Sequence, residues 1–199
     1  MKEIYLYGAG GHAKVILDIL QEKEVSVKAI FDDNTEIKEL LDIPVEAYDS
    51  QSPLIISIGN NRIRKEIADK LTSVSFETAI SRRAVVSERA SIGSGTVVMQ
   101  GAVVQSCAEV GKHAIINTGA TVDHDCVIGD YVHIAPGCTL CGNVTVGEGT
   151  FIGAGTVIIP GVKIGKWAVI GAGSVIRKDI PDNVMAVGNP CITIKTLTI

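Results

Sequence analysis

Two histidines stand near acidic residues in the stretch ATVDHDCVIGDYVHIAPG, residues 120–137. His124 lies between Asp123 and Asp125, and His133 follows nine positions later. An imidazole titrates near neutral pH, and a neighbouring carboxylate can orient the ring and raise its basicity. His124 is therefore a candidate general base, and either aspartate could serve as its partner.

The candidate base lies in a six-residue repeat that begins at Ala84. Sixteen consecutive units carry Val, Ile or Leu at the third place and a small or β-branched residue at the first. Glycine recurs at the fourth and sixth places, where it permits the positive φ of tight turns. A period of six does not match the α-helix but fits a short strand plus a turn. The repeat therefore predicts a parallel β-helix whose third residues form an internal column.

These units resemble the hexapeptide repeat of the left-handed β-helix acyltransferases, in which three units form one triangular coil. The resemblance implies that residues 18 positions apart stack on successive coils. Ser106, His124 and Gly142 would then share one corner, with Asp125 at the place beside it. A corner points outward, so His124 would be open to chemistry.

Composition and charge restrict the possible classes of protein. The chain has 199 residues and a formal charge of −4 without a basic run, which gives no reason to expect nucleic acid or an anionic membrane as partner. The N-terminus does not read as a signal peptide, and no apolar run reaches membrane-spanning length. Five cysteines make an odd set, so reduced thiols in a cytoplasmic protein are expected. Cys138 and Cys141 lack a second pair, so they predict no zinc or redox site.

Residues 1–80 differ in composition from the repeat and predict a separate domain. KEIYLYGAGGHAKVILDIL reads as strand, glycine turn and helix, VKAIFDD as a second strand, and PLIISIGNNRIRKEIADKL as a third strand and helix. This order predicts a small Rossmann-like α/β half domain. The β-helix and a C-terminal tail would occupy residues 81–199.

The first glycine turn, Gly8-x-Gly10-x-x-Ala13, matches a dinucleotide fingerprint with Asp32 and Asp33 about twenty positions on. About eighty residues are too few for both halves of a dinucleotide fold, so a nucleotide or nucleotide sugar is favoured over NAD. The glycines would let the backbone approach a phosphate at a helix N-terminus. A purely structural alternative is a cap over the open end of the β-helix.

Taken together, GAGGH, FDD, IGNNRIRKEI and HDCVIGDYVHIAPG closely resemble one family of sugar acetyltransferases. It includes bacterial UDP-4-amino-sugar N-acetyltransferases and sialic acid O-acetyltransferases. The resemblance implies that the first domain holds a nucleotide sugar, while acetyl-CoA lies along the β-helix between the subunits of a homotrimer. It implies direct, metal-independent acetylation of a UDP-linked 4-amino sugar, with O-acetylation of sialic acid or another sugar as the alternative.

The resemblance also implies roles for single residues. His124 would be the proton acceptor, modulated by Asp125, and the backbone N–H of Gly142 would receive the thioester oxygen. The positions expected to contact acetyl-CoA are His133, Gly142, Ala154 and Ala172. The positions expected to hold the nucleotide-sugar acceptor are Gly10, Gly11, His12, Asp32, Asp33, Gly59 and Asn117.

Two other classes of protein remain as alternatives. A zinc enzyme of the γ-carbonic-anhydrase type would use His113, His124 and His133, but those relatives have no domain like residues 1–80. A non-catalytic sugar-binding scaffold would lack the His124–Asp125 pair. By itself, His113 is expected to be a solvated side chain at an exposed turn.

The C-terminal tail departs from the family pattern. Cys191 stands where alanine is usual, and the basic residue that normally follows is replaced by Lys195 four positions later. The cations that could instead meet the CoA phosphates are Lys163, Lys166, Arg177 and Lys178.

Overall fold

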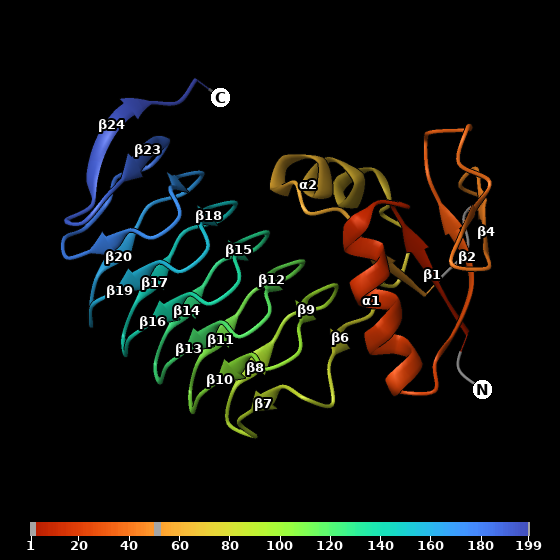
Figure 1. Cartoon of the computed structure of the whole chain (residues 1–199), viewed down its shortest axis with the longest axis horizontal. Helices are drawn as coiled ribbons and strands as arrows, with labels where there is room; N and C mark the ends of the chain where they lie inside the picture. Colours follow the sequence, from red (N-terminus) through yellow and green to blue (C-terminus); the bar gives the residue numbers. More distant parts are fainter. Residues whose placement is uncertain (1–2, 50–52, 199) are drawn as a thin grey trace.

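The computed structural model describes residues 3–49 and 53–198, and it has two parts (Figure 1). An α/β region stands at one end of a long β-helix, and a C-terminal hairpin closes the other end. The α/β elements are β1 (Glu3–Tyr7), α1 (Gly11–Glu22), β2 (Ser26–Phe31), β3 (Glu39–Leu40), β4 (Ile43–Glu46), β5 (Leu54–Ile56) and α2 (Asn61–Lys70).

The α/β region is a single sheet with a helix on each face. Its strand order is β3-β4-β2-β1-β5, and all neighbours are parallel except β3 and β4. Alternate residues of β1 point to opposite faces, so Ile4 and Leu6 pack with α1 while Tyr5 and Tyr7 pack with the α2 side. The predicted Rossmann-like half is confirmed, although the sequence analysis did not anticipate β3 and β4.

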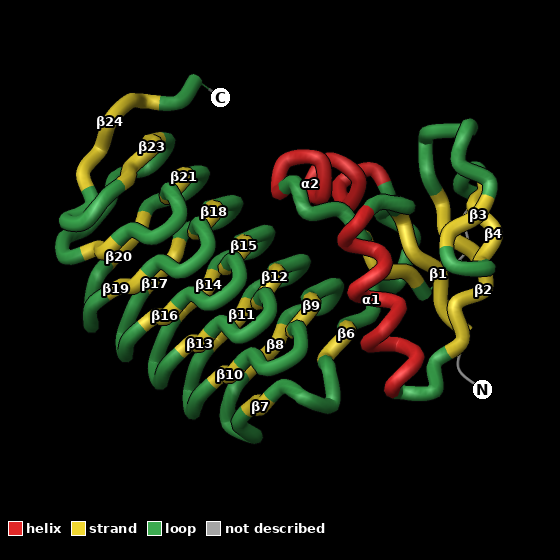
Figure 2. The backbone as a smooth tube through the Cα atoms, viewed as in Figure 1, coloured by secondary structure: helices red, strands yellow, loops and turns green. Residues whose placement is uncertain are grey.

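The β-helix has three sides, each a stack of parallel strands (Figure 2). The first side contains β7 (Val85–Val86), β10 (Val103–Val104), β13 (Thr121–Val122), β16 (Thr139–Leu140), β19 (Val157–Ile158) and β22 (Val175–Ile176). The second contains β8 (Ser91–Ile92), β11 (Glu109–Val110), β14 (Val127–Ile128), β17 (Thr145–Val146) and β20 (Lys163–Ile164). The third contains β6 (Ala79–Ile80), β9 (Val97–Val98), β12 (Ile115–Ile116), β15 (His133–Ile134), β18 (Phe151–Ile152), β21 (Val169–Ile170), β23 (Val184–Val187) and β24 (Ile192–Thr196).

The stacking register confirms three units per coil and the left-handed β-helix. Thr121 pairs with Val103 on one neighbouring strand and with Thr139 on the other, which are steps of 18 residues. Third-place residues such as Val122 and Leu140 are completely buried and form the internal column. The three corners join first to second side (first corner), second to third side (second corner) and third to first side (third corner).

The two parts of the chain share a hydrophobic core. Ala13 and Ile16 of α1 pack in one cluster with Val97, Met99 and Ile115 from the third side. Figure 1 accordingly shows α1 between the α/β sheet and the first coils. The α/β region is thus fixed against one particular side of the β-helix, which decides what its loops can reach. None of the described helices has the length and apolar character needed to cross a membrane.

Neighbouring residues of β14 test the internal column. Ile128 is 2% exposed and points inward, whereas Val127 is 44% exposed. Ile128→Ala should lower the free energy of unfolding by about 2–5 kcal/mol, because it removes buried methyl groups and leaves a cavity. Val127→Ala, the matched control, should change it by less than about 0.5 kcal/mol. Chemical denaturation checks both, and equal effects would contradict the inward and outward assignment.

Candidate active site

His124 lies at the first corner and is held by the carboxylate that follows it. Its Nδ1 is 2.7 Å from Oδ2 of Asp125. Asp123 instead accepts a hydrogen bond from the backbone N–H of His124 at 2.8 Å. Asp125 takes the left-handed conformation of the corner, with φ of 58°. Of the two aspartates that the sequence left open, Asp125 is therefore the one that contacts the ring.

Both aspartates act on the pKa of His124. The hydrogen bond with Asp125 raises it most, and the negative charge of Asp123 raises it further. The two side chains of the pair are about half exposed, so the ring is accessible from solvent. An exposed imidazole with a carboxylate on Nδ1 can accept a proton on Nε2.

Gly142 lies directly under the His124 ring on the next coil. A Cβ added there would meet Cε1 of the ring at 2.6 Å and Nε2 at 2.7 Å, so only glycine lets the imidazole occupy this place. Asn143 donates its backbone N–H to the His124 carbonyl, which locks the two coils in register. Within the described residues, the N–H of Gly142 has no hydrogen-bond acceptor.

A second group of predicted residues comes together on the third side. His133 Nε2 is 3.0 Å from the side-chain nitrogen of Asn117, and its Nδ1 is 3.4 Å from the carbonyl oxygen of Gly59. Phe151 packs edge-on against the ring, with centroids 5.1 Å apart. Burial, and then the positive charge of Arg64, lowers the pKa of His133 to about 4. His133 is therefore neutral at physiological pH.

The glycine turns of the α/β region leave open space. A Cβ added at Gly10, Gly11 or Gly59 would meet no atom within 4 Å. The next residue, His12, has a pKa lowered to about 4 by burial and by Arg64. Its buried Nε2 has no hydrogen-bond partner among the described residues.

The two aspartates that follow β2 are partly used by the protein itself. Asp32 accepts hydrogen bonds from the backbone N–H groups of Ala9 and Asn34, at 2.7 and 2.8 Å. Asp33 accepts one from the hydroxyl of Tyr7 at 2.7 Å. Asp32 therefore ties the end of β2 to the first glycine turn, and both carboxylates stand beside the open glycines.

A cavity of about 470 Å³ lies beside the His133 group. It is lined by Gly59, Asn60, Asn61, Arg62, Gly149, Phe151, Trp167, Val169, Leu197 and Thr198. The sequence analysis missed its aromatic wall. The repeat register contained a signal for part of it, because His133, Phe151 and Val169 are 18 residues apart and share one outward column. The guanidinium of Arg62 over Trp167 had no such signal.

The structure does not bring all predicted positions together within one chain. His124, Asp125 and Gly142 meet at the first corner, whereas Asn117, His133 and Gly59 meet at the third side. Ala154 and Ala172 are exposed and stack at the third corner. Arg177 and Lys178, two candidate cations, line another hollow of about 340 Å³ with Pro190, Cys191 and Ile192.

The expectation that His113 is a solvated side chain is wrong. It is 3% exposed and lies between Phe76 and Tyr131, stacked on the latter with centroids 5.2 Å apart. Because its own chain encloses the ring, His113 is not available for a zinc site with His124 and His133. Among the described residues, no group of three His, Cys, Asp or Glu side chains is arranged to hold a metal ion.

Comparisons with known proteins match both parts of the chain. A family model of the PglD N-terminal domain matches residues 3–71, and one of the bacterial transferase hexapeptide (six repeats) matches residues 108–142 and 143–178. An uncharacterized protein of Acanthamoeba polyphaga mimivirus is 34% identical over 92 residues. That match covers 42% of this chain but only 18% of the viral protein.

Several solved structures resemble nearly the whole chain. A variant of perosamine N-acetyltransferase from Caulobacter crescentus, in complex with CoA and GDP-perosamine, is 37% identical with a TM-score of 0.94 over 98% of both chains. The acetyltransferase domain of PglB from Neisseria gonorrhoeae, in complex with acetyl coenzyme A, is 35% identical with a TM-score of 0.92 over 97% of this chain and 99% of that one. WeeI from Acinetobacter baumannii is 29% identical, with a TM-score of 0.88 over 97% and 100%.

The contact between His124 and Asp125 predicts a change in titration. Asp125→Asn should lower the pKa of His124, because the largest cause of its upward shift is this hydrogen bond. Asp123→Asn, the control, removes a charge without breaking the ring contact and should lower the pKa less. NMR titration of the His124 ring measures both variants. An equal or larger effect of Asp123→Asn would contradict the assignment of Asp125 as partner.

Proposed function

The chain belongs to the hexapeptide-repeat family of sugar acetyltransferases, and on that premise we propose that it acetylates the amino group of a nucleotide-linked sugar with acetyl-CoA. The relative from Caulobacter crescentus, whose complex holds CoA and GDP-perosamine, supports a nucleotide amino sugar as acceptor. UDP is one carrier to be tested beside GDP. The observation that carries the mechanism is the exposed His124 ring with Asp125 at 2.7 Å from Nδ1.

His124 acts in this proposal as the general base of a direct transfer. The amine nitrogen of the sugar attacks the carbonyl carbon of the thioester, and a proton of the amine passes to His124 Nε2. The new C–N bond forms, the C–S bond breaks, and the proton leaves with the CoA thiol. Asp125 stabilises the imidazolium that forms in between. The free N–H of Gly142 would stabilise the oxyanion of the tetrahedral intermediate.

The α/β region supplies the acceptor site in this proposal. Gly10, Gly11 and Gly59 leave room for a phosphate or sugar to approach the backbone, and the open N-terminus of α1 favours an anion there. His12 offers its unpartnered Nε2, and Asp32 and Asp33 close the same edge of the sheet. On the third side, Asn117 would bind the acceptor near the reacting amine.

A homotrimer would complete the site. The proposed base is at the first corner, while Asn117, His133 and the cavity are at the third side of the same chain. Threefold symmetry would place the first corner of one subunit against the third side of its neighbour. Acetyl-CoA would lie in that groove and contact His133, Gly142, Ala154 and Ala172. The five free cysteines suit the reduced, cytoplasmic setting expected for CoA chemistry.

Replacement of the base tests the proposed mechanism. His124→Ala should lower kcat by about 10²- to 10⁴-fold, the range of general-base assistance, with little change in the KM for acetyl-CoA. The rate should fall as pH falls through the pKa of His124, because the base must be neutral. Steady-state kinetics with a panel of UDP- and GDP-linked amino sugars measures these effects. Near-full activity of His124→Ala, or activity abolished by a zinc chelator, would rule the mechanism out.

A further inference from the structure

Arg64 of α2 is buried between the α/β region and the second corner of the β-helix, with 1% of its surface exposed. Burial lowers its pKa to about 9, so the guanidinium remains charged at neutral pH. Each of its five N–H groups has an oxygen acceptor, and all five acceptors are neutral. They are the backbone carbonyls of Ile58, Gly59, His113 and Tyr131 and the side-chain oxygen of Asn61, at 2.8–3.2 Å.

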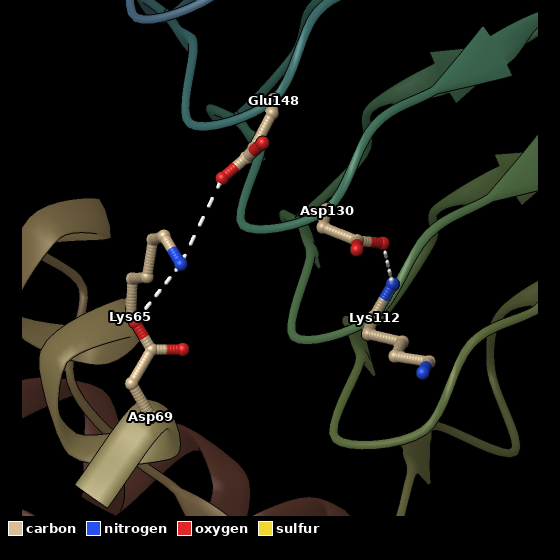
Figure 3. Close-up of polar contacts among 5 residues, drawn as sticks. All are labelled: Lys65, Asp69, Lys112, Asp130 and Glu148. Carbon is tan, nitrogen blue, oxygen red and sulfur yellow. Dashed lines mark hydrogen bonds and ion pairs between the residues drawn. The ribbon is translucent and has the colours of Figure 1, made fainter.

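Exposed ion pairs form the outer edge of the same contact (Figure 3). Lys65 lies between Asp69 of α2 and Glu148 of the second corner, at 2.9 and 4.0 Å. On the neighbouring coils, Asp130 accepts a hydrogen bond from the backbone N–H of Lys112. Exposed pairs contribute little to stability. The buried guanidinium is therefore the polar group that fixes α2 against the β-helix.

The carbonyl oxygen of Gly59 is shared between Arg64 and His133. Arg64 Nη1 donates to it at 3.2 Å, and His133 Nδ1 lies 3.4 Å from the same atom. A carbonyl oxygen only accepts hydrogen bonds, so this contact requires a proton on Nδ1. In a neutral ring with that proton, Nε2 is an acceptor.

Asn117 requires the same tautomer from the other side of the ring. Its side-chain oxygen accepts a hydrogen bond from the backbone N–H of Thr118 at 2.8 Å, which turns its amide nitrogen toward His133. That nitrogen is 3.0 Å from His133 Nε2. An amide nitrogen only donates, so Nε2 carries no proton. Two contacts on different ring nitrogens thus agree on the neutral Nδ1–H form.

The surroundings of His133 keep the ring neutral. Burial and the charge of Arg64 lower its pKa to about 4; the hydrogen bond to Gly59 opposes this shift and the neighbouring His12 adds to it. Protonation would also place an N–H of the ring against the N–H of Asn117, which would break that contact. The position of Arg64 therefore bears on both the charge and the orientation of the pair.

We propose that Arg64 is a positioning residue that acts through the Gly59 carbonyl and the His133 ring on the side-chain amide of Asn117. Held in this way, Asn117 keeps its second amide N–H free of partners among the described residues. That N–H is directed to an oxygen of the bound sugar acceptor. The identity of this substrate rests on the proposed function, whereas the orientation of His133 and Asn117 does not.

Nitrogen NMR of the full-length protein with labelled histidine tests the orientation, since only four histidines need assignment. Wild-type His133 should be neutral with its proton on Nδ1 at neutral pH and down to about pH 5. Arg64→Met removes the donor to Gly59 and the charge, so the His133 pKa should rise and the two tautomers should mix. Arg64→Lys keeps the charge but loses the planar fork, so its tautomers should also mix.

Kinetics separate positioning from folding. Loss of one oriented hydrogen bond to the acceptor should raise the KM for the nucleotide sugar about tenfold in both Arg64 variants. The KM for acetyl-CoA should change less. Lys65→Met is the matched control, because it removes exposed contacts of the same helix and leaves Gly59 untouched. It should alter neither the His133 spectrum nor the KM values.

Asn117→Asp keeps the proposal falsifiable if the Arg64 variants do not fold. It preserves the side-chain shape but sets a carboxylate oxygen opposite His133 Nε2, so the His133 pKa should rise. A wild-type ring with its proton on Nε2 would overturn the proposal, as would an unchanged His133 spectrum in a folded Arg64 or Asn117 variant. An absence of sugar acetylation by the wild-type protein would instead refute the proposed function, and the NMR outcome would still decide the orientation.

Discussion

Backbone hydrogen bonding between residues 18 positions apart is the constraint on which the rest of the structure depends. It joins Val103, Thr121 and Thr139 along one side and repeats on the other two sides. The place of a residue within its coil therefore decides whether it enters the column, lines a flat side or stands at a corner. His124 stands at a corner, and the same register brings Gly142 beneath its ring.

The β-helix also decides what the α/β region can reach. The α1 helix shares a core with the third side, and the buried Arg64 ties α2 to the second corner. These two contacts carry the Gly59 turn to His133, and they leave the first corner without any contribution from the α/β region of the same chain. The acid–base group and the proposed acceptor pocket are thus separated by the geometry of a triangular coil, and a neighbouring subunit is the means by which we propose that they meet.

The sequence could predict what depends on local periodicity. The hexad register was sufficient to place His124, Asp125 and Gly142 together, and the glycine turn with Asp32 and Asp33 was sufficient to indicate the Rossmann-like half. Contacts between distant segments were beyond it. Burial of His113 depends on Phe76 and Tyr131, and the environment of His133 depends on Gly59 and Arg64, which no repeat relates to it. The short strands β3 and β4 carry too few residues to show a period.

Mixing two inactive variants tests the central claim, that the base and the acceptor pocket come from different subunits. His124→Ala lacks the base but keeps the pocket, whereas Gly10→Val keeps the base and places a branched side chain where the acceptor must approach. In trimers assembled from equal amounts of both, about a quarter of the sites would combine an intact base with an intact pocket. We therefore predict that co-expressed variants recover about a quarter of wild-type activity. Mixed trimers as inactive as either parent would show that each chain uses its own base and pocket, which would contradict the account.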